Sequence, residues 1–120
     1  LQYGAQRIGH GIAAIKDPTL MQACRDAHIG FELCPTSNFQ TKAVTDASSY
    51  PLRAFLDFGL LATINTDNRT VSHTTLTDEY AFALEQLAIK KEDLRTLYKN
   101  SVEISFADDS VKHQLLYLLP

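Results

Sequence analysis

Three short apolar segments alternate with segments of helical pattern, and this order constrains the fold more than any other feature of the chain. The apolar segments cover residues 6–12, 29–35 and 60–66, and helical patterns over residues 16–30 and 50–59 separate them. Short apolar strands that alternate with helices are typical of a parallel α/β sheet whose strands are buried on both faces. We therefore expect three parallel strands joined by right-handed crossovers.

The helical segments carry start and stop signals. Asp17 is a favourable N-cap, Pro18 takes the first helical position, and Gly30 follows the expected end of this helix. Thr75 is expected to cap the helix over residues 74–89. Two more helices are predicted over residues 91–106 and 108–119.

Three parallel strands are too few to make a closed sheet. They leave two open edges and an exposed sheet face, and the sequence contains no evident device that protects them. The chain also starts with Leu1 and reaches an apolar segment within seven residues. We therefore interpret residues 1–120 as one incomplete α/β domain, part of a larger sheet or barrel. The chain by itself is expected to self-associate through its open edges, unless the last helices shield the sheet.

The composition limits the kinds of partner that the chain can bind and indicates its cellular location. A net charge of −3 argues against a nucleic-acid-binding surface, and no apolar run approaches the ~20 residues that a membrane helix requires. Cys24 and Cys34 have the spacing of neither a disulfide framework nor a zinc knuckle. They are interpreted as buried free thiols, which favours a reducing cytoplasmic location.

Each apolar segment ends in residues that can carry chemistry, at the position where α/β enzymes place their active sites. His10 lies between two glycines and can act as an acid, a base, a metal ligand or an electrostatic stabiliser. Asp67 follows the third segment and can ligate zinc or accept a proton. The alternatives are structural: in them His10 only bonds a nearby loop, and Asp67 only forms a turn or a helix cap.

Other polar residues at these exits have similar alternatives. Asn68 suits a turn, while Ser37 and Asn38 could bond a ligand or tie down the long loop expected over residues 36–49. No H-x-H, H-E-x-x-H or C-x-x-C motif occurs, so the sequence contains no self-sufficient metal site.

Three motifs together resemble the adenosine deaminase family of zinc-dependent purine deaminases. They are RIGHG at 7–11, LCPTSN at 33–38 and INTDN at 64–68, in this order and spacing. The resemblance implies the C-terminal portion of a (β/α)8 (TIM) barrel, with three parallel strands and additional C-terminal helices. It also implies that the other zinc ligands and a catalytic glutamate lie upstream of residue 1.

The resemblance assigns roles to three residues. Asp67 is similar to the aspartate that ligates zinc and accepts the proton of the attacking water. His10 is similar to the histidine that orients the attacking hydroxide and stabilises its charge. Asn68 stands where many members have a second aspartate that bonds a purine ring nitrogen. An amide can donate to N7 without first being protonated, so Asn68 suits this task.

The implied function is zinc-dependent hydrolytic deamination of adenosine to inosine and ammonia, with a small purine nucleoside as the partner. Adenine or adenosine monophosphate is the alternative substrate within the same family. A non-catalytic scaffold is the alternative outside it. Because the chain cannot complete a zinc site, it is expected to be inactive by itself.

Overall fold

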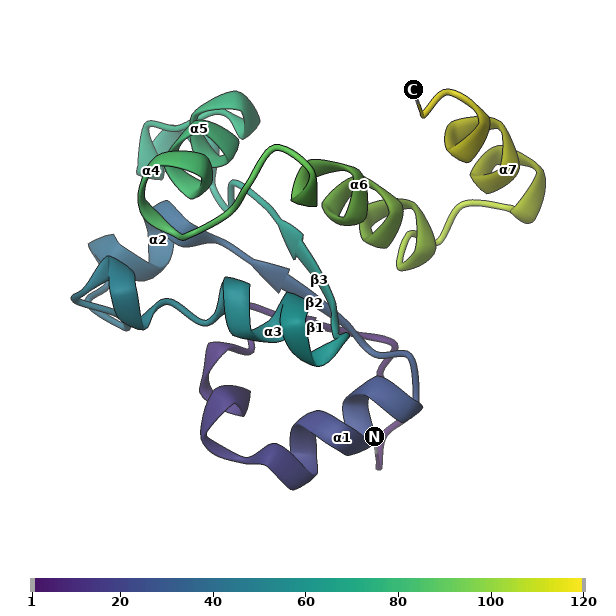
Figure 1. Ribbon diagram of the computed structural model, residues 1–120, viewed down its shortest axis with the longest axis horizontal. Helices are drawn as coiled ribbons and strands as arrows, with labels where there is room; N and C mark the ends of the chain where they lie inside the picture. The colour runs from purple at the N-terminus through teal and green to yellow at the C-terminus, as the bar shows by residue number, and fades with distance from the viewer. Residues whose placement is uncertain (1, 120) are drawn as a thin grey trace.

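A three-stranded parallel sheet forms the centre of the computed structural model, which describes residues 2–119 (Figure 1). The strands are β1 (Arg7–Gly9), β2 (Gly30–Leu33) and β3 (Leu61–Ile64), in the order β1-β2-β3. Both neighbouring pairs are parallel, and Phe31 of β2 is level with Ile8 of β1 and Ala62 of β3. The predicted parallel arrangement is therefore confirmed.

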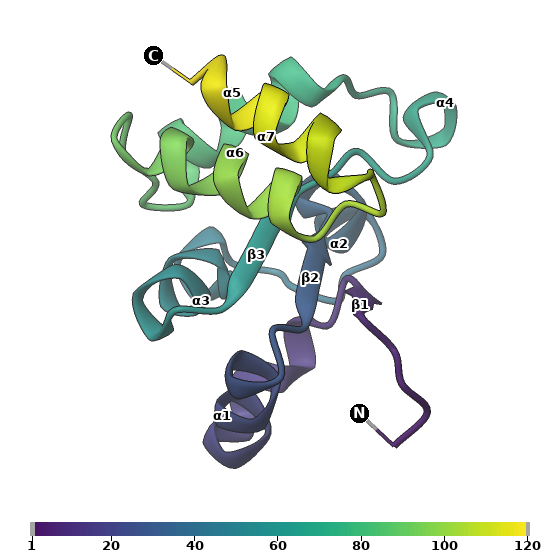
Figure 2. The same ribbon diagram turned by 90° about the vertical axis from the view of Figure 1, so that its right-hand side faces the viewer.

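Helices connect and cover the strands. Helix α1 (Pro18–Asp26) lies between β1 and β2, and α3 (Leu52–Phe58) precedes β3. Figure 2 shows α1 at the end of the sheet where the strands begin and α2 at the end where they stop. The remaining elements are η1 (Ile12–Lys16), α2 (Pro35–Gln40), η2 (Ala47–Ser49), α4 (Arg69–Ser72), α5 (Leu76–Gln86), α6 (Asp93–Glu103) and α7 (Asp109–Tyr117).

The core lies between β2, β3 and the helices that cover them. Phe31 and Leu33 of β2 are fully buried, and the Phe31 ring meets the Phe55 ring of α3 edge-on, with centroids 5.2 Å apart. Leu97 of α6 belongs to the same cluster. Burial of each such side chain contributes roughly 1.5–3 kcal/mol, so this cluster holds the strands and helices together.

The predicted N-caps are confirmed, but one predicted helix end is wrong. The Asp17 carboxylate accepts a hydrogen bond from the Leu20 amide at 3.0 Å, and Thr75 forms a capping box with Asp78. Gly30 does not end α1, because it is already the first residue of β2. A Cβ atom at Gly30 would lie 2.6 Å from Ile104 Cγ2, so glycine is needed there for close packing.

The prediction of a long loop over residues 36–49 is also wrong for its first part, because α2 extends to Gln40. Pro35 occupies the first turn of this helix, which suits its fixed φ angle. A partner distant in sequence then contacts the same turn: Glu79 of α5 accepts a hydrogen bond from the Thr36 amide at 3.1 Å. The local polar composition contains no sign of this partner, so the pattern alone indicated a loop.

Helix α6 covers part of the open edge of β3. The Asn65 amide bonds to Leu33 of β2, and backbone groups alternate along a strand, so the Ala62 carbonyl points away from β2. The Asn100 side-chain amide of α6 donates to this carbonyl at 2.8 Å. The β3 edge, for which the sequence shows no evident protection, thus has a polar partner from the last third of the chain.

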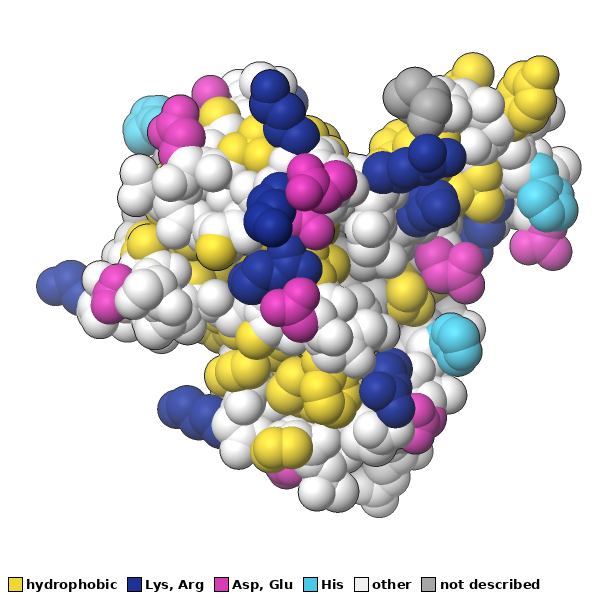
Figure 3. All heavy atoms as spheres, viewed as in Figure 1, with side chains coloured by type: hydrophobic (Ala, Val, Ile, Leu, Met, Phe, Trp, Pro, Cys, Tyr) yellow, Lys and Arg dark blue, Asp and Glu magenta, His cyan; other side chains and the backbone are white. Residues whose placement is uncertain are grey.

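The surface has a mixed charge. On the face drawn in Figure 3, basic and acidic side chains are interspersed among hydrophobic and uncharged groups, in agreement with the net charge of −3. Within residues 2–119, no helix has the length and apolar character needed to cross a bilayer.

Candidate active site

The residues that follow the three strands meet at one end of the sheet. His10 follows β1, Cys34 follows β2, and Asp67 follows β3. One potential ligand atom from each lies within 4.8 Å of the others, and His10 Nε2 is 3.4 Å from Asp67 Oδ2. A hollow of about 280 Å³ is lined by these three residues and by Gly9, Glu32 and Asn65. His10 and Asp67, which follow the first and the third strand, are therefore in contact.

Both positions have a strained backbone, a feature they share among the described residues with His28, Lys42, His73 and Ala88. His10 has φ 58° and Asp67 has φ 55°, both in the left-handed region that costs a non-glycine residue roughly 1–2 kcal/mol. Gly11 continues the turn with φ 66°, and a Cβ atom there would lie 2.7 Å from the Phe31 ring. Such strain is typical of functional sites, where the surrounding structure holds a side chain in a required direction.

One oxygen of Asp67 is engaged and the other is open. Ser37 Oγ donates to Oδ2 at 2.8 Å, and His10 Nε2 faces the same oxygen. Among residues 2–119, no donor is hydrogen-bonded to Oδ1. The Asp67 side chain is 40% exposed, so Oδ1 is free to contact a ligand or a metal ion.

His10 is held from its other ring nitrogen. The Asn38 side-chain amide lies 3.1 Å from Nδ1, and the Tyr50 hydroxyl donates to Asn38 Oδ1 at 2.9 Å. Ser37 and Asn38 thus contact the site residues themselves, which neither alternative in the sequence analysis stated. Tyr50 was missed because no local pattern connects it to the strand exits.

The cap considered for Asp67 is formed instead by the next residue. Asn68 Oδ1 accepts hydrogen bonds from the amides of Thr70 and Val71 at 3.1 and 3.0 Å, and it starts the short helix α4. The turn role considered for Asn68 is therefore present. Because Asn68 caps the helix, the Asp67 carboxylate is free to face His10, while the exposed Asn68 side chain keeps an NH₂ group that can donate.

Cys34 lies beside the pair but keeps its proton. Burial is the main cause that raises its pKa to about 11, and the carboxylates of Asp67, Glu79 and Glu32 add to this effect. Its Sγ atom is 3.5 Å from the Glu32 carbonyl oxygen. Cys24 and Cys34 are both buried free cysteines, as predicted.

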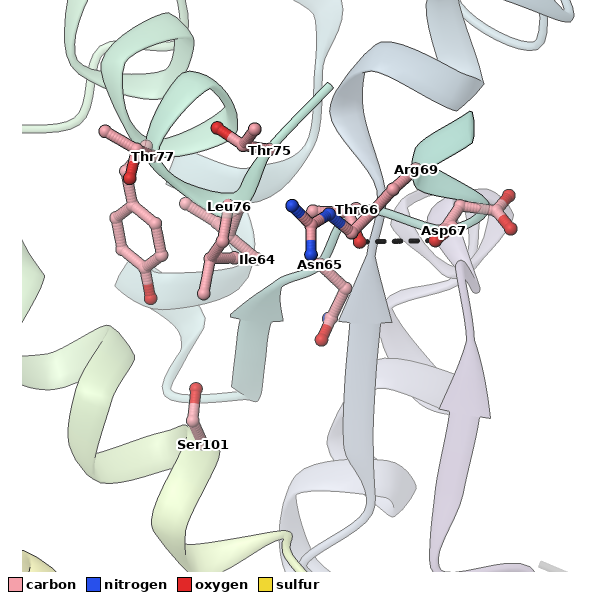
Figure 4. Close-up of a pocket in the computed structure, with 10 residues that line it drawn as sticks. Ile64, Asn65, Thr66, Asp67, Arg69, Thr75, Leu76, Thr77 and Ser101 are labelled. Atoms are coloured by element: carbon pink, nitrogen blue, oxygen red, sulfur yellow. Dashed lines mark hydrogen bonds between the residues drawn. The ribbon is translucent and has the colours of Figure 1, made fainter. Parts of the chain in front are cut away.

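A larger hollow of about 670 Å³ opens on the other side of Asp67, between the end of β3, α5 and α6. In Figure 4, the Arg69 side chain extends across this hollow toward Leu76, while the Asp67 carboxylate points the opposite way. Asn65 and Asp67 line both hollows. Asp67 therefore lies between a small hollow that contains His10 and a wider one that contains the Arg69 guanidinium group.

The groups present fit a zinc ion with partial coordination from this chain. Zinc sites in proteins use carboxylate oxygen and imidazole nitrogen, and Asp67 Oδ1 is an open carboxylate ligand with an imidazole beside it. The Cys34 thiol completes this group of potential ligand atoms, which all lie within 4.8 Å of one another. Asp67, with His10 beside it, could thus serve as a ligand of such an ion.

Parallel strands covered by helices, with His10 and Asp67 paired at their carboxyl ends, have the arrangement of part of an α/β barrel, a fold whose active sites lie at this end of the strands. A solved adenine deaminase from Arthrobacter aurescens matches 93% of the chain with a TM-score of 0.88 and 29% identity. The N6-methyl-AMP deaminase from Arabidopsis thaliana matches 94% with a TM-score of 0.76 and 28% identity. The predicted TIM-barrel fold class is confirmed.

The chain belongs to the adenosine deaminase family, because the family profile described as adenosine deaminase matches residues 1–119. An adenosine deaminase from Shewanella woodyi is 47% identical over 115 residues, which make up 96% of this chain and 35% of that protein. The match covers 34% of the adenine deaminase chain and 33% of the N6-methyl-AMP deaminase chain. The chain thus spans about a third of the length of these relatives.

Proposed function

We propose that this chain contributes part of the active site of a zinc-dependent hydrolytic deaminase that converts adenosine to inosine and ammonia. The observation that carries the proposal is the contact of His10 Nε2 with Asp67 Oδ2 at 3.4 Å, at the carboxyl ends of parallel strands. The relative from Shewanella woodyi, named adenosine deaminase, supports adenosine as the substrate. A cytoplasmic location stays a prediction.

The proposed mechanism divides the work among Asp67, His10 and Asn68, and Ser37 supports Asp67. A bound zinc ion would lower the pKa of water toward ~7. Asp67 would hold the ion and would accept the proton of the attacking water, and the Ser37 hydroxyl keeps its carboxylate in place. His10 donates from Nε2 to the oxygen on which negative charge develops, and the Asn68 amide donates to a purine ring nitrogen.

A nucleotide is the second candidate substrate, and Arg69 is the observation that favours it. Its guanidinium lies in the wide hollow beside Asp67 and could pair with a phosphate. A relative of the same fold is an N6-methyl-AMP deaminase. If the substrate is adenosine monophosphate, Arg69→Gln will raise its KM strongly, whereas turnover of adenosine will change little.

The first test measures ammonia release by the full-length protein. Adenosine, adenine and adenosine monophosphate are each offered as the substrate. His10→Ala should lower kcat by about 10²–10³-fold with a small change in KM, because its donated bond acts mainly in the transition state. Asp67→Ala should remove activity and lower the zinc content measured by mass spectrometry. His113→Ala, on α7, is the control and should behave like the unmodified protein.

Three results would contradict the proposal. An equal effect of His10→Ala on kcat and on KM would remove the role assigned to His10. Unchanged zinc content in Asp67→Ala would remove the role assigned to Asp67 as a ligand. A full-length protein that turns over none of the three purines would favour the non-catalytic scaffold.

A further inference from the structure

Buried polar groups hold the ring nitrogen of His10 that faces away from Asp67. Asn38 and Tyr50 are 4% and 5% exposed, and they connect in series to Nδ1 of His10. We infer that Tyr50 and Asn38 are positioning residues that fix His10 in the tautomer with its proton on Nε2. The catalytic benefit of this tautomer rests on the proposed function, whereas the tautomer itself does not.

The direction of the Asn38 amide decides the tautomer. The Tyr50 hydroxyl donates to Oδ1 of Asn38, so the NH₂ end of the amide faces His10. An NH₂ group can only donate, and a ring nitrogen that accepts must be bare. In neutral His10 the proton is then on Nε2, the nitrogen that lies 3.4 Å from Asp67 Oδ2.

Tyr50 prevents the amide from turning over. If Asn38 were reversed, its NH₂ group would point at the phenol, and the Tyr50 proton would need a different acceptor. Within residues 2–119, Asn38 Oδ1 is the acceptor that the Tyr50 hydroxyl has. Burial raises the pKa of Tyr50 well above its ordinary value, so the hydroxyl stays a donor at every working pH.

The Tyr50 ring is itself held in place. It stacks on Phe39 with centroids 5.7 Å apart and an interplanar angle of 24°. Phe39 follows Asn38 in α2, so the same short helix presents both the amide and the ring that supports its partner. The loop over residues 41–49 returns the chain to α2 and brings Tyr50 to Asn38, which gives this segment a role in the site.

The experiment reads the tautomer directly in the full-length protein labelled with ¹⁵N-histidine. Long-range ¹H–¹⁵N correlation spectra distinguish a bare ring nitrogen from a protonated one, and the His10 signals are assigned by their loss in His10→Gln. We expect a bare Nδ1 in the unmodified protein. In Asn38→Asp the carboxylate can only accept, so Nδ1 becomes protonated. In Tyr50→Phe the amide can turn, so both tautomers appear.

The kinetic readout separates positioning from a structural role. Asn38→Asp should lower kcat by about 10²-fold, the typical loss for one misdirected donor at a transition state, with KM within about twofold. Tyr50→Phe should lower kcat roughly fivefold, because the net free energy of one typical hydrogen bond corresponds to about this factor in a rate. Tyr98→Phe is the matched control, because it removes a hydroxyl that donates to Leu115 at 3.0 Å, and it should change neither kcat nor the His10 spectrum.

The outcomes separate this inference from the proposed function. A protonated Nδ1 in the unmodified neutral protein, or a His10 spectrum unchanged in Tyr50→Phe, would overturn the inference even if purines are turned over. If Asn38→Asp does not fold, Tyr50→Phe carries the test alone. A bare Nδ1 that responds to both variants, in a protein with no purine turnover, would support the tautomer assignment and overturn the proposed function.

Discussion

Single residues at the strand exits have conformations that only their surroundings can maintain. His10 and Asp67 have left-handed backbone conformations although neither is glycine. The buried Asn38 side chain contacts His10, and the buried Ser37 side chain contacts Asp67. The sequence indicated the chemistry of His10 and Asp67 because an imidazole and a carboxylate follow strands at the position where α/β enzymes place their active sites. It could not indicate their strain, because φ angles at these positions depend on contacts with distant segments.

Gly30 provides a test of close packing at this scale. Gly30→Ala should lower the free energy of unfolding by about 1–3 kcal/mol, because the new methyl group would lie 2.6 Å from Ile104 Cγ2. Urea denaturation of the full-length protein measures this change. Gly9→Ala is the control, since among residues 2–119 a Cβ atom there would meet nothing within 4 Å.

A double-mutant cycle completes this test. In the Gly30→Ala background, Ile104→Ala should cost less stability than it costs in the unmodified protein, because the smaller side chain makes room for the new methyl group. Additive effects of the two substitutions would show that Ile104 does not cause the need for glycine.

Elements are tied together by ion pairs of unequal burial. Arg53 of α3 contacts Asp93 at the start of α6 and Asp57 of its own helix, each at 2.7 Å. The Asp93 side chain is 17% exposed and the Asp57 side chain is 64% exposed. The same guanidinium therefore makes a sheltered contact between elements and an exposed contact within one helix.

Substitution of these two aspartates should lower the free energy of unfolding by different amounts. Asp93→Asn should lower the free energy of unfolding at pH 7 by about 1–2 kcal/mol, because it weakens a sheltered charge-assisted bond. Asp57→Asn, the matched control, should cost less than about 0.5 kcal/mol, as is typical of exposed helical pairs. Equal effects in chemical denaturation would contradict the role given to burial.

The same pair predicts a pH dependence. Burial, the largest influence, tends to raise the pKa of Asp93, but hydrogen bonds from the Lys90 amide and Arg53 hold it below its ordinary value of 3.8. A depressed carboxyl pKa adds stability above about pH 4, and this stability is lost as the pH falls through the folded-state pKa. The stability difference between the unmodified protein and Asp93→Asn should therefore shrink below about pH 4.

At the scale of the whole molecule, the sheet has edges of different character. Asn100 of α6 supplies a partner to β3, so one edge is partly covered. Strand β1 lies at the other end of the sheet, where Arg7 and Gly9 alternate with residues whose backbone groups bond to β2. A free edge of this kind favours pairing with a further strand.

Self-association of the 120-residue chain stays a prediction that follows from this edge. The chain produced by itself should form dimers or larger species whose share rises with concentration, measured by size-exclusion chromatography with light scattering. A monomer at every concentration tested would show that the edge is protected in some other way. In either case the isolated chain should turn over no purine, because Asp67 is the one zinc ligand that we propose for it.

The sequence by itself determined the alternation of strands and helices, the caps at Asp17 and Thr75, and the identity of the groups at the strand exits. These features depend on neighbours within a few residues, so local patterns encode them. Only the tertiary structure decided that His10 and Asp67 touch, that Tyr50 turns the Asn38 amide toward His10, and that residues 35–40 form a helix. Each of these outcomes depends on contacts between segments far apart in the chain, which a local pattern cannot specify.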